Sequence, residues 1–396
     1  MGNTQTEAVI HAYDRYVMNT YVRSPVVITK AKGSRVWDVE GREYLDLFPG
    51  WGVSGVGYNH PWVLQALRGQ SRRIIHVSNN YYQPLQWRAA KKLVDASFDG
   101  KVFFTNSGAE AVETAVKLAR RWGQGRYEII AMERSFHGRT LAALSATGQA
   151  KHQQGFEPLV PGFVHVPFND LEAVRRAITP KTCAILVEPI QGEGGVRVAS
   201  DEFLRGLREL CDTHKLLLLM DEIQTGMGRT GRWFAYQHSG AQPDVLLLAK
   251  TLGGGFPIGA VIATRAIADT LTPGTHATTY GGNPMGCACI LAVCEAVEAQ
   301  QLLERVARLS PSIFQRLAAI RQQVPMIQDI RGRGFMVGIE LSQDGRPIVE
   351  ACRAKGLLIN CTQERILRLL PAMTITRAQL DRALSILEQV LQQAAP

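Results

Sequence analysis

The stretch from Pro243 to Ala260 reads PDVLLLAKTLGGGFPIGA, and it decides how the rest of the chain is interpreted. Its apolar run, Val245 to Leu248, is typical of a strand buried on both faces of a parallel sheet. Lys250 follows that run and precedes three consecutive glycines. A lysine placed there lies at the carboxyl edge of a sheet, where α/β folds bind ligands, and partial burial would make it a nucleophile. From this stretch alone, a surface lysine beside a turn is an equally good interpretation.

A second apolar run, Leu216 to Met220, predicts another buried strand, and it delivers Asp221 to the same edge. A carboxylate there is costly unless a cationic group faces it. The protonated ring nitrogen of pyridoxal phosphate would be such a group, because this cofactor is held by a Schiff-base lysine and activated by an aspartate at the ring nitrogen. We therefore interpret Lys250 and Asp221 as the catalytic pair of a pyridoxal-phosphate enzyme.

A third signal lies between Lys101 and Arg121, where a strand-like run is followed by a helical pattern of apolar residues. This pattern places Ser107, Gly108 and Ala109 at the helix N-terminus. Free backbone N–H groups and the helix dipole favour an anion there, and a glycine lets a phosphate approach closely. A plain serine N-cap is the better interpretation of this segment alone. Together with the lysine and aspartate strands, a phosphate site is favoured.

From about Tyr21 to the C-terminus, the chain closely resembles the class III, ornithine aminotransferase-like pyridoxal-phosphate aminotransferases, and within them the acetylornithine aminotransferases. The resemblance implies the type I pyridoxal-phosphate transferase fold, an α/β fold in which a large domain with a mostly parallel seven-stranded sheet is joined to a smaller α+β domain. We expect residues 1–55 to form an N-terminal segment that packs with the small domain. Residues 56–285 would form the cofactor-binding domain and residues 286–396 the small domain.

The resemblance also assigns cofactor contacts. Phe136, in the motif SFHGRT, takes the place of the aromatic residue that stacks on the cofactor ring. Gln224 matches the residue that bonds the phenolic oxygen. Thr279 matches a threonine that reaches across a homodimer to the phosphate, and the loop from Val77 to Tyr82 resembles one that lines the neighbouring subunit's active site.

Four further residues are substrate-binding candidates by resemblance. Arg139 takes the place of an arginine that binds a substrate carboxylate, for which a guanidinium is well suited. Glu193, in a glycine-rich loop, is expected to pair with Arg368 of the C-terminal domain. Trp51 stands where the ornithine-acting relatives carry a tyrosine, so it is either a wall of the substrate pocket or ordinary hydrophobic filler. His137 is a weaker candidate for a base, because Lys250 fills that role.

The implied reaction transfers the terminal amino group of N-acetylornithine to 2-oxoglutarate, giving N-acetylglutamate semialdehyde and glutamate. Succinylornithine, ornithine, 4-aminobutyrate or a carrier-linked lysine precursor would use the same residues, and a racemase or decarboxylase would share the cofactor chemistry. A non-catalytic pyridoxal-phosphate sensor is disfavoured because the lysine and the aspartate are both retained and no DNA-binding domain is attached.

The composition of the 396 residues limits the remaining possibilities. A hydrophobic content of 46% excludes a disordered chain. The formal charge of +9 is spread thinly, without a basic run and interleaved aromatics, so we do not expect nucleic-acid binding. No uncharged apolar stretch of about 18 residues and no signal peptide is evident, which predicts a cytoplasmic protein without membrane contact. The seven cysteines lack zinc-ligand spacing, so we expect buried free thiols and no metal.

Overall fold

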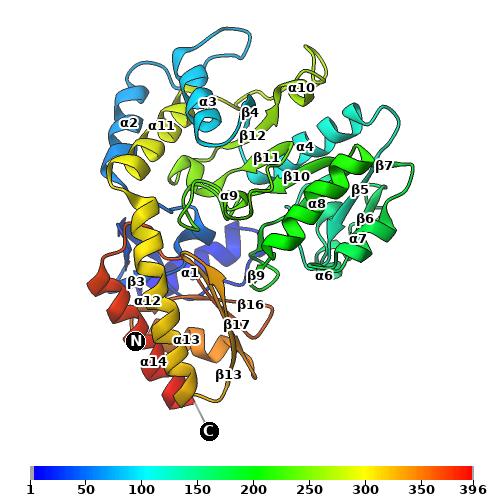
Figure 1. The fold of residues 1–396 in the computed structure, drawn as a ribbon. Helices are drawn as coiled ribbons and strands as arrows, with labels where there is room; N and C mark the ends of the chain where they lie inside the picture. The colour runs from blue at the N-terminus through cyan, green and yellow to red at the C-terminus, as the bar shows by residue number, and fades with distance from the viewer. Residues whose placement is uncertain (1–3, 395–396) are drawn as a thin grey trace.

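The computed structural model describes residues 4–394, and its largest element is a seven-stranded sheet (Figure 1). All neighbouring strands are parallel except β12, which is antiparallel to both of its neighbours. The predicted mostly parallel sheet is therefore confirmed. In spatial order its strands are β4 (Gly100–Thr105), β12 (Gly259–Thr264), β11 (Val245–Leu248), β10 (Leu217–Asp221), β7 (Thr182–Val187), β5 (Glu128–Met132) and β6 (Phe163–Val166).

Both faces of this sheet are covered by helices, which explains why its central strands are apolar throughout. Along β10, Leu217 and Leu219 pack with α4, whereas Leu218 and Met220 pack with α8 on the other face. Each β10 side chain is buried. The helices of the large domain are α4 (Gly108–Trp122), α5 (Leu141–Ala146), α6 (Ala150–Gln153), α7 (Leu171–Ala177), α8 (Asp201–His214), α9 (Tyr236–Ser239) and α10 (Arg265–Ala268).

A smaller antiparallel sheet lies below the large one in Figure 1 and confirms the predicted α+β unit. Its strands, in spatial order, are β13 (Ile327–Arg333), β14 (Met336–Leu341), β17 (Ile366–Leu369) and β16 (Asn360–Thr362). The accompanying helices are α12 (Leu302–Gln323), α13 (Arg346–Ala354) and α14 (Arg377–Ala394). Helix α14 begins with a capping box, in which the backbone N–H groups of Thr376 and Gln379 each donate to the other residue's side chain, at 3.0 and 3.1 Å.

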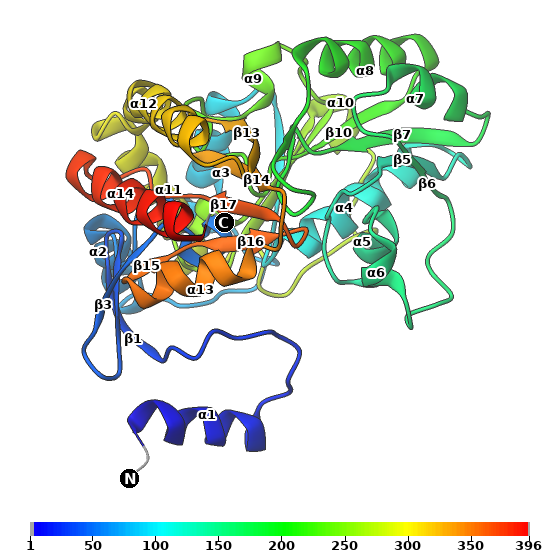
Figure 2. The ribbon, with the colours of Figure 1, turned by 90° about the horizontal axis from the view of Figure 1, so that it is seen from below.

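The N-terminal segment forms an antiparallel meander and packs with the C-terminal part of the chain. Its strands are β1 (Ile28–Lys32), β2 (Arg35–Asp38) and β3 (Glu43–Asp46), and β15 (Leu357–Leu358) joins β3 in parallel. Helix α1 (Gln5–Tyr16) buries none of its side chains and lies at the edge of the molecule (Figure 2), where Thr6 donates to the side chain of Glu40 at 3.1 Å.

Three further helices lie at the other end of the large domain: α2 (Pro61–Ser71), α3 (Pro84–Ala96) and α11 (Pro284–Ala299). Helix α11 packs against α2 and α3. A division of the chain at about residue 285 stays a prediction, and α11, on the C-terminal side of that division, contacts η2 (Lys250–Gly253) of the large domain. The shortest elements are the 3-10 turns η1 (Pro49–Gly52) and η2 (Lys250–Gly253) and the hairpin strands β8 (Ile190–Gln191) and β9 (Arg197–Val198).

Within residues 4–394, no single helix is long and apolar enough to cross a membrane. Helices α11 and α12 together meet the length and composition test across a 61° bend, but their apolar side chains are largely buried inside the protein. The same residues contain no group of three His, Cys, Asp or Glu side chains that could hold a metal ion. All seven cysteines are free, and only Cys361 is partly exposed.

Candidate active site

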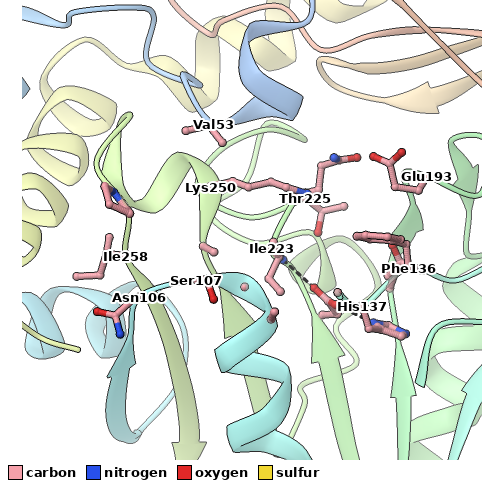
Figure 3. A pocket seen from close by; sticks show the side chains of 18 of the residues that line it. Val53, Asn106, Ser107, Phe136, His137, Glu193, Ile223, Thr225, Lys250 and Ile258 are labelled. Carbon is pink, nitrogen blue, oxygen red and sulfur yellow. Dashed lines mark hydrogen bonds and ion pairs between the residues drawn. The ribbon is translucent and has the colours of Figure 1, made fainter. Parts of the chain in front are cut away.

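A cavity of about 390 Å³ lies at the carboxyl edge of the large sheet (Figure 3). Its lining includes residues that follow successive strands: Ser107 after β4, Phe136 after β5, Glu188 after β7, and Asp221 and Lys250 at β10 and β11. Parallel strands bring the residues at their carboxyl ends to one edge, so segments far apart in the sequence converge here. The volume lies within the range typical of small-molecule sites.

Lys250 enters the cavity from a strained turn. Its backbone has φ of 49°, in the left-handed region, because the chain turns sharply from β11 into η2. Figure 3 shows the side chain extending across the cavity. Burial lowers the pKa of the Lys250 amine, and the nearby Glu193 and Asp221 carboxylates oppose that shift. A lowered pKa increases the neutral fraction of the amine, which is the form that attacks a carbonyl and accepts a proton.

Asp221 is held in place by two hydrogen bonds. One carboxylate oxygen accepts from the backbone N–H of Ile223 at 3.0 Å, and the other lies 2.8 Å from Nδ1 of His137. Both side chains are buried, and the backbone N–H of His137 donates to Thr147 at 2.9 Å. The structure thus gives His137 a contact that the sequence did not reveal. His137 orients the Asp221 carboxylate. In the sequence, only the position of His137 in the loop after β5 indicated that it lies near the cavity.

The start of helix α4 forms the end of the cavity near Ser107. The Ser107 hydroxyl caps the helix by accepting from the backbone N–H of Glu110 at 3.2 Å, so the N-cap interpretation is correct. That cap still leaves the backbone N–H groups at Gly108 and Ala109 at the cavity wall. A Cβ atom added at Gly108 would lie 2.9 Å from Cδ1 of Ile223. The backbone at Gly108 therefore lies close to the Ile223 side chain, in a part of the cavity that suits a bound phosphate.

Phe136 forms a flat apolar wall of the cavity. Its backbone N–H donates to a carboxylate oxygen of Glu188 at 3.1 Å. The pKa of Glu188 lies well above its usual value, because burial and the nearby Asp221 charge both disfavour ionisation. The guanidinium of Arg139 lies 5.5 Å from the centre of the Phe136 ring, and the exposed Arg139 side chain does not itself line the cavity.

Glu193 and Arg368 form an ion pair between the glycine-rich loop and strand β17. The two distances are 2.6 Å from Nη1 to Oε1 and 3.1 Å from Nη2 to Oε2, a bidentate geometry. Asn360 accepts from Nε and Nη2 of Arg368, at 3.2 and 2.9 Å, and the guanidinium lies 4.7 Å from the centre of the Phe48 ring. Arg368 is thus held on three sides. The Arg368 side chain is 1% exposed and that of Glu193 is 24% exposed.

The remaining candidates lie around the cavity at different depths. Gln224 lines it and donates to the carbonyl of Trp51 at 3.3 Å. The Trp51 side chain is 48% exposed and does not line the cavity. Thr279 is exposed and also lies outside the lining of this cavity. The roles expected for Trp51, Thr279 and Arg139 therefore stay predictions.

Comparison with known proteins identifies the class to which this fold and site belong. A family model described as aminotransferase class-III matches residues 16–391. The chain belongs to the class III aminotransferases, which are pyridoxal-phosphate-dependent enzymes. It is 46% identical over 381 residues to the acetylornithine aminotransferase of Methanocaldococcus jannaschii, covering 95% of this chain and 96% of that protein. A Pseudomonas aeruginosa protein named succinylornithine transaminase/acetylornithine aminotransferase is 43% identical over 388 residues, covering 96% of each chain.

Two solved structures show the same fold. The ornithine aminotransferase of Toxoplasma gondii has a TM-score of 0.95 and 34% identity, covering 99% of this chain and 96% of that one. The acetylornithine aminotransferase of Elizabethkingia anophelis has a TM-score of 0.89 and 32% identity, covering 99% and 100%. The type I pyridoxal-phosphate fold expected from the sequence is therefore confirmed.

The residues present fit pyridoxal phosphate. A buried carboxylate, Asp221, would face the ring nitrogen, and Lys250 would hold the aldehyde carbon. The start of α4 would bind the phosphate, and Phe136 would cover one face of the ring. When bound, this cofactor withdraws electrons from a substrate carbon attached through its amine.

Proposed function

We propose that this enzyme transfers the terminal amino group of N-acetylornithine to 2-oxoglutarate and so forms N-acetylglutamate semialdehyde and glutamate. The observation that carries the proposal is the ion pair between Glu193 and Arg368 at 2.6 and 3.1 Å. A neutralised arginine accommodates the amine end of N-acetylornithine, which carries no carboxylate. The names of relatives at 43–46% identity support the same substrate.

Lys250 is the acid–base group of the reaction. Its amine would hold the cofactor and, once free, would accept the proton from the amine-bearing carbon of the substrate. Asp221 is positioned to keep the ring nitrogen protonated, because its carboxylate is fixed by Ile223 and His137. A fixed negative charge needs no reorganisation during the reaction.

The same cavity must accept two unlike substrates, and we propose that Glu193 makes this switch. With N-acetylornithine bound, Glu193 stays paired with Arg368. With 2-oxoglutarate or glutamate bound, the carboxylate next to the reacting carbon takes the place of Glu193 on Arg368. Asn360 and Phe48 hold the arginine in either case. Arg139 binds the carboxylate at the far end of both substrates.

We also propose a homodimer with shared active sites. Thr279 and residues 78–82 of the loop are exposed in the single chain, and Tyr81 and Tyr82 are among its most exposed aromatic residues. In this arrangement Thr279 would reach the phosphate site of the other subunit. Sedimentation equilibrium of the purified enzyme measures the assembly directly.

The substrate proposal is tested by stopped-flow absorbance of the purified yellow enzyme without 2-oxoglutarate. N-acetylornithine, succinylornithine, ornithine and 4-aminobutyrate are mixed with it separately. Loss of the visible cofactor band much faster with N-acetylornithine than with ornithine supports the proposal. Faster loss with succinylornithine or 4-aminobutyrate would replace the substrate and keep the reaction. No loss with any of the four would contradict amino transfer from these amines.

A further inference from the structure

A second pocket, of about 340 Å³, lies outside the active site and is lined by three arginines. Arg134 follows β5, Arg197 lies on β9 and Arg331 lies on β13. In Figure 1, β9 lies at the junction between the large domain and the small sheet. Phe168 and Val198 provide apolar walls. The arginines thus come from three separate parts of the fold.

The three guanidinium groups differ in their partners. Arg331 is fully engaged: Nη1 binds Asp329 at 2.7 Å and Glu340 at 2.6 Å, while Nε and Nη2 donate to the carbonyl of Gly195. Within residues 4–394, the side chains of Arg134 and Arg197 have no hydrogen-bond or ion-pair partner. The Nε atom of Arg197 is itself buried. A partly desolvated guanidinium without an acceptor costs free energy, so a ligand that accepts from its Nη groups would be stabilised.

The electrostatics agree with this geometry. Burial lowers the pKa of Arg197, and the positive charges of Arg134 and Arg331 lower it further, against the opposing effect of Glu340 and Asp329. Like charges brought together in a half-buried pocket are relieved by an anion between them. Glu133 also lines the pocket, so its charge offsets one of the two unpaired arginines. The remaining positive charge favours an anionic head group.

We propose that this pocket binds a small anion through a carboxylate or phosphate head group, held by Arg134 and Arg197. The bound group would accept from the Nη groups of Arg197, in the bidentate manner that arginine favours.

The pocket is connected to the loop that carries Glu193. Arg331 donates to the carbonyl of Gly195 at 3.0 and 2.8 Å, and Arg197 follows the same turn two residues later. On the other side of this turn, Thr362 and Gln363 both donate to the carbonyl of Glu193 at 2.8 Å. An anion at Arg197 therefore fixes one end of the turn on which Glu193 must move, and slows its movement away from Arg368. This second step rests on the proposed function.

Isothermal titration calorimetry of the cofactor-loaded enzyme tests the binding step, with inorganic phosphate and malonate as separate probes. We expect saturable binding of at least one probe, weakened about tenfold or more in Arg197→Gln, as expected for the loss of a charge-assisted hydrogen bond. Arg175→Gln is the matched control, because Arg175 is an exposed arginine of α7 paired with Glu172. A preference for phosphate or for malonate identifies the head group. No saturable binding, or equal weakening by both substitutions, would overturn the proposal.

The coupling step is measured by stopped-flow reaction of glutamate with the enzyme, at zero and saturating probe. We expect the probe to slow this reaction in wild type and to have no effect in Arg197→Gln, whose own rate without probe should equal that of wild type. Binding without any change in rate would overturn the coupling and leave the anion site intact. Thermal unfolding of both variants checks that a lost signal reflects the site and not the fold.

Discussion

Replacing Glu193 with glutamine separates the two half-reactions of the enzyme. In the structure Arg368 donates two charge-assisted hydrogen bonds to Glu193 and is further supported by Asn360 and Phe48. A glutamine keeps one acceptor oxygen and removes the negative charge. The guanidinium stays in place because its other partners remain, but it is no longer neutralised.

The expected size of the rate changes follows from the loss of competition between Glu193 and the substrate carboxylate for Arg368. A hydrogen bond to a charged group contributes roughly 1.5–3 kcal/mol, which corresponds to about 10–150-fold in an equilibrium or a rate. A substrate whose reacting carbon carries a carboxylate, such as glutamate, no longer has to displace Glu193, so its reaction rate per unit concentration rises by up to that factor. N-acetylornithine has no carboxylate at that end and meets an unneutralised arginine, so its reaction slows by a similar factor.

The assay is single-turnover absorbance, run once with glutamate and once with N-acetylornithine, in wild type and Glu193→Gln. Because kcat/KM reports transition-state stabilisation relative to free substrate, the ratio of the two values isolates the effect of the pair. Glu202→Gln provides a charge-matched control, since Glu202 pairs with Arg205 on the exposed surface of α8. If both half-reactions change by the same factor, Glu193 does not act as the switch.

The other predictions concern acid–base chemistry and stability. Lys250→Ala should lower the single-turnover rate by at least about 100-fold while still binding the cofactor, as shown by its absorbance after gel filtration. His137→Phe removes the partner of Asp221 at 2.8 Å and should lower kcat about tenfold with little change in KM; a change confined to KM would contradict an orienting role. Burial raises the pKa of Glu222 to about 7, so the stability of wild type relative to Glu222→Gln should be greatest below about pH 4.5 and fall by about 3 kcal/mol as the pH rises through 7, as urea unfolding at several pH values would show. Thr376→Ala removes the cap of α14 and should cost about 1 kcal/mol in the same assay, whereas no loss would mean that the cap is replaced by solvent.

The sequence alone determined the elements whose signals are local. Unbroken apolar runs predicted the buried strands that carry Asp221 and Lys250, because a strand covered on both faces has no place for polar side chains. The start of α4 at Ser107 and the capping box at Thr376 follow from residues three apart. Parallel strands share one carboxyl edge, so the convergence of these groups was also predictable.

Long-range contacts were decided only by the tertiary structure. The sequence contains nothing that joins His137 to Asp221 or Arg197 to Arg134, since these contacts depend on the order of strands in the sheets. The left-handed backbone at Lys250 is likewise imposed by packing, because a lysine has no intrinsic preference for that conformation. Resemblance to a family supplied the pairing of Glu193 with Arg368, and the fold explains it, because β17 and the glycine-rich loop meet where the small sheet contacts the large domain.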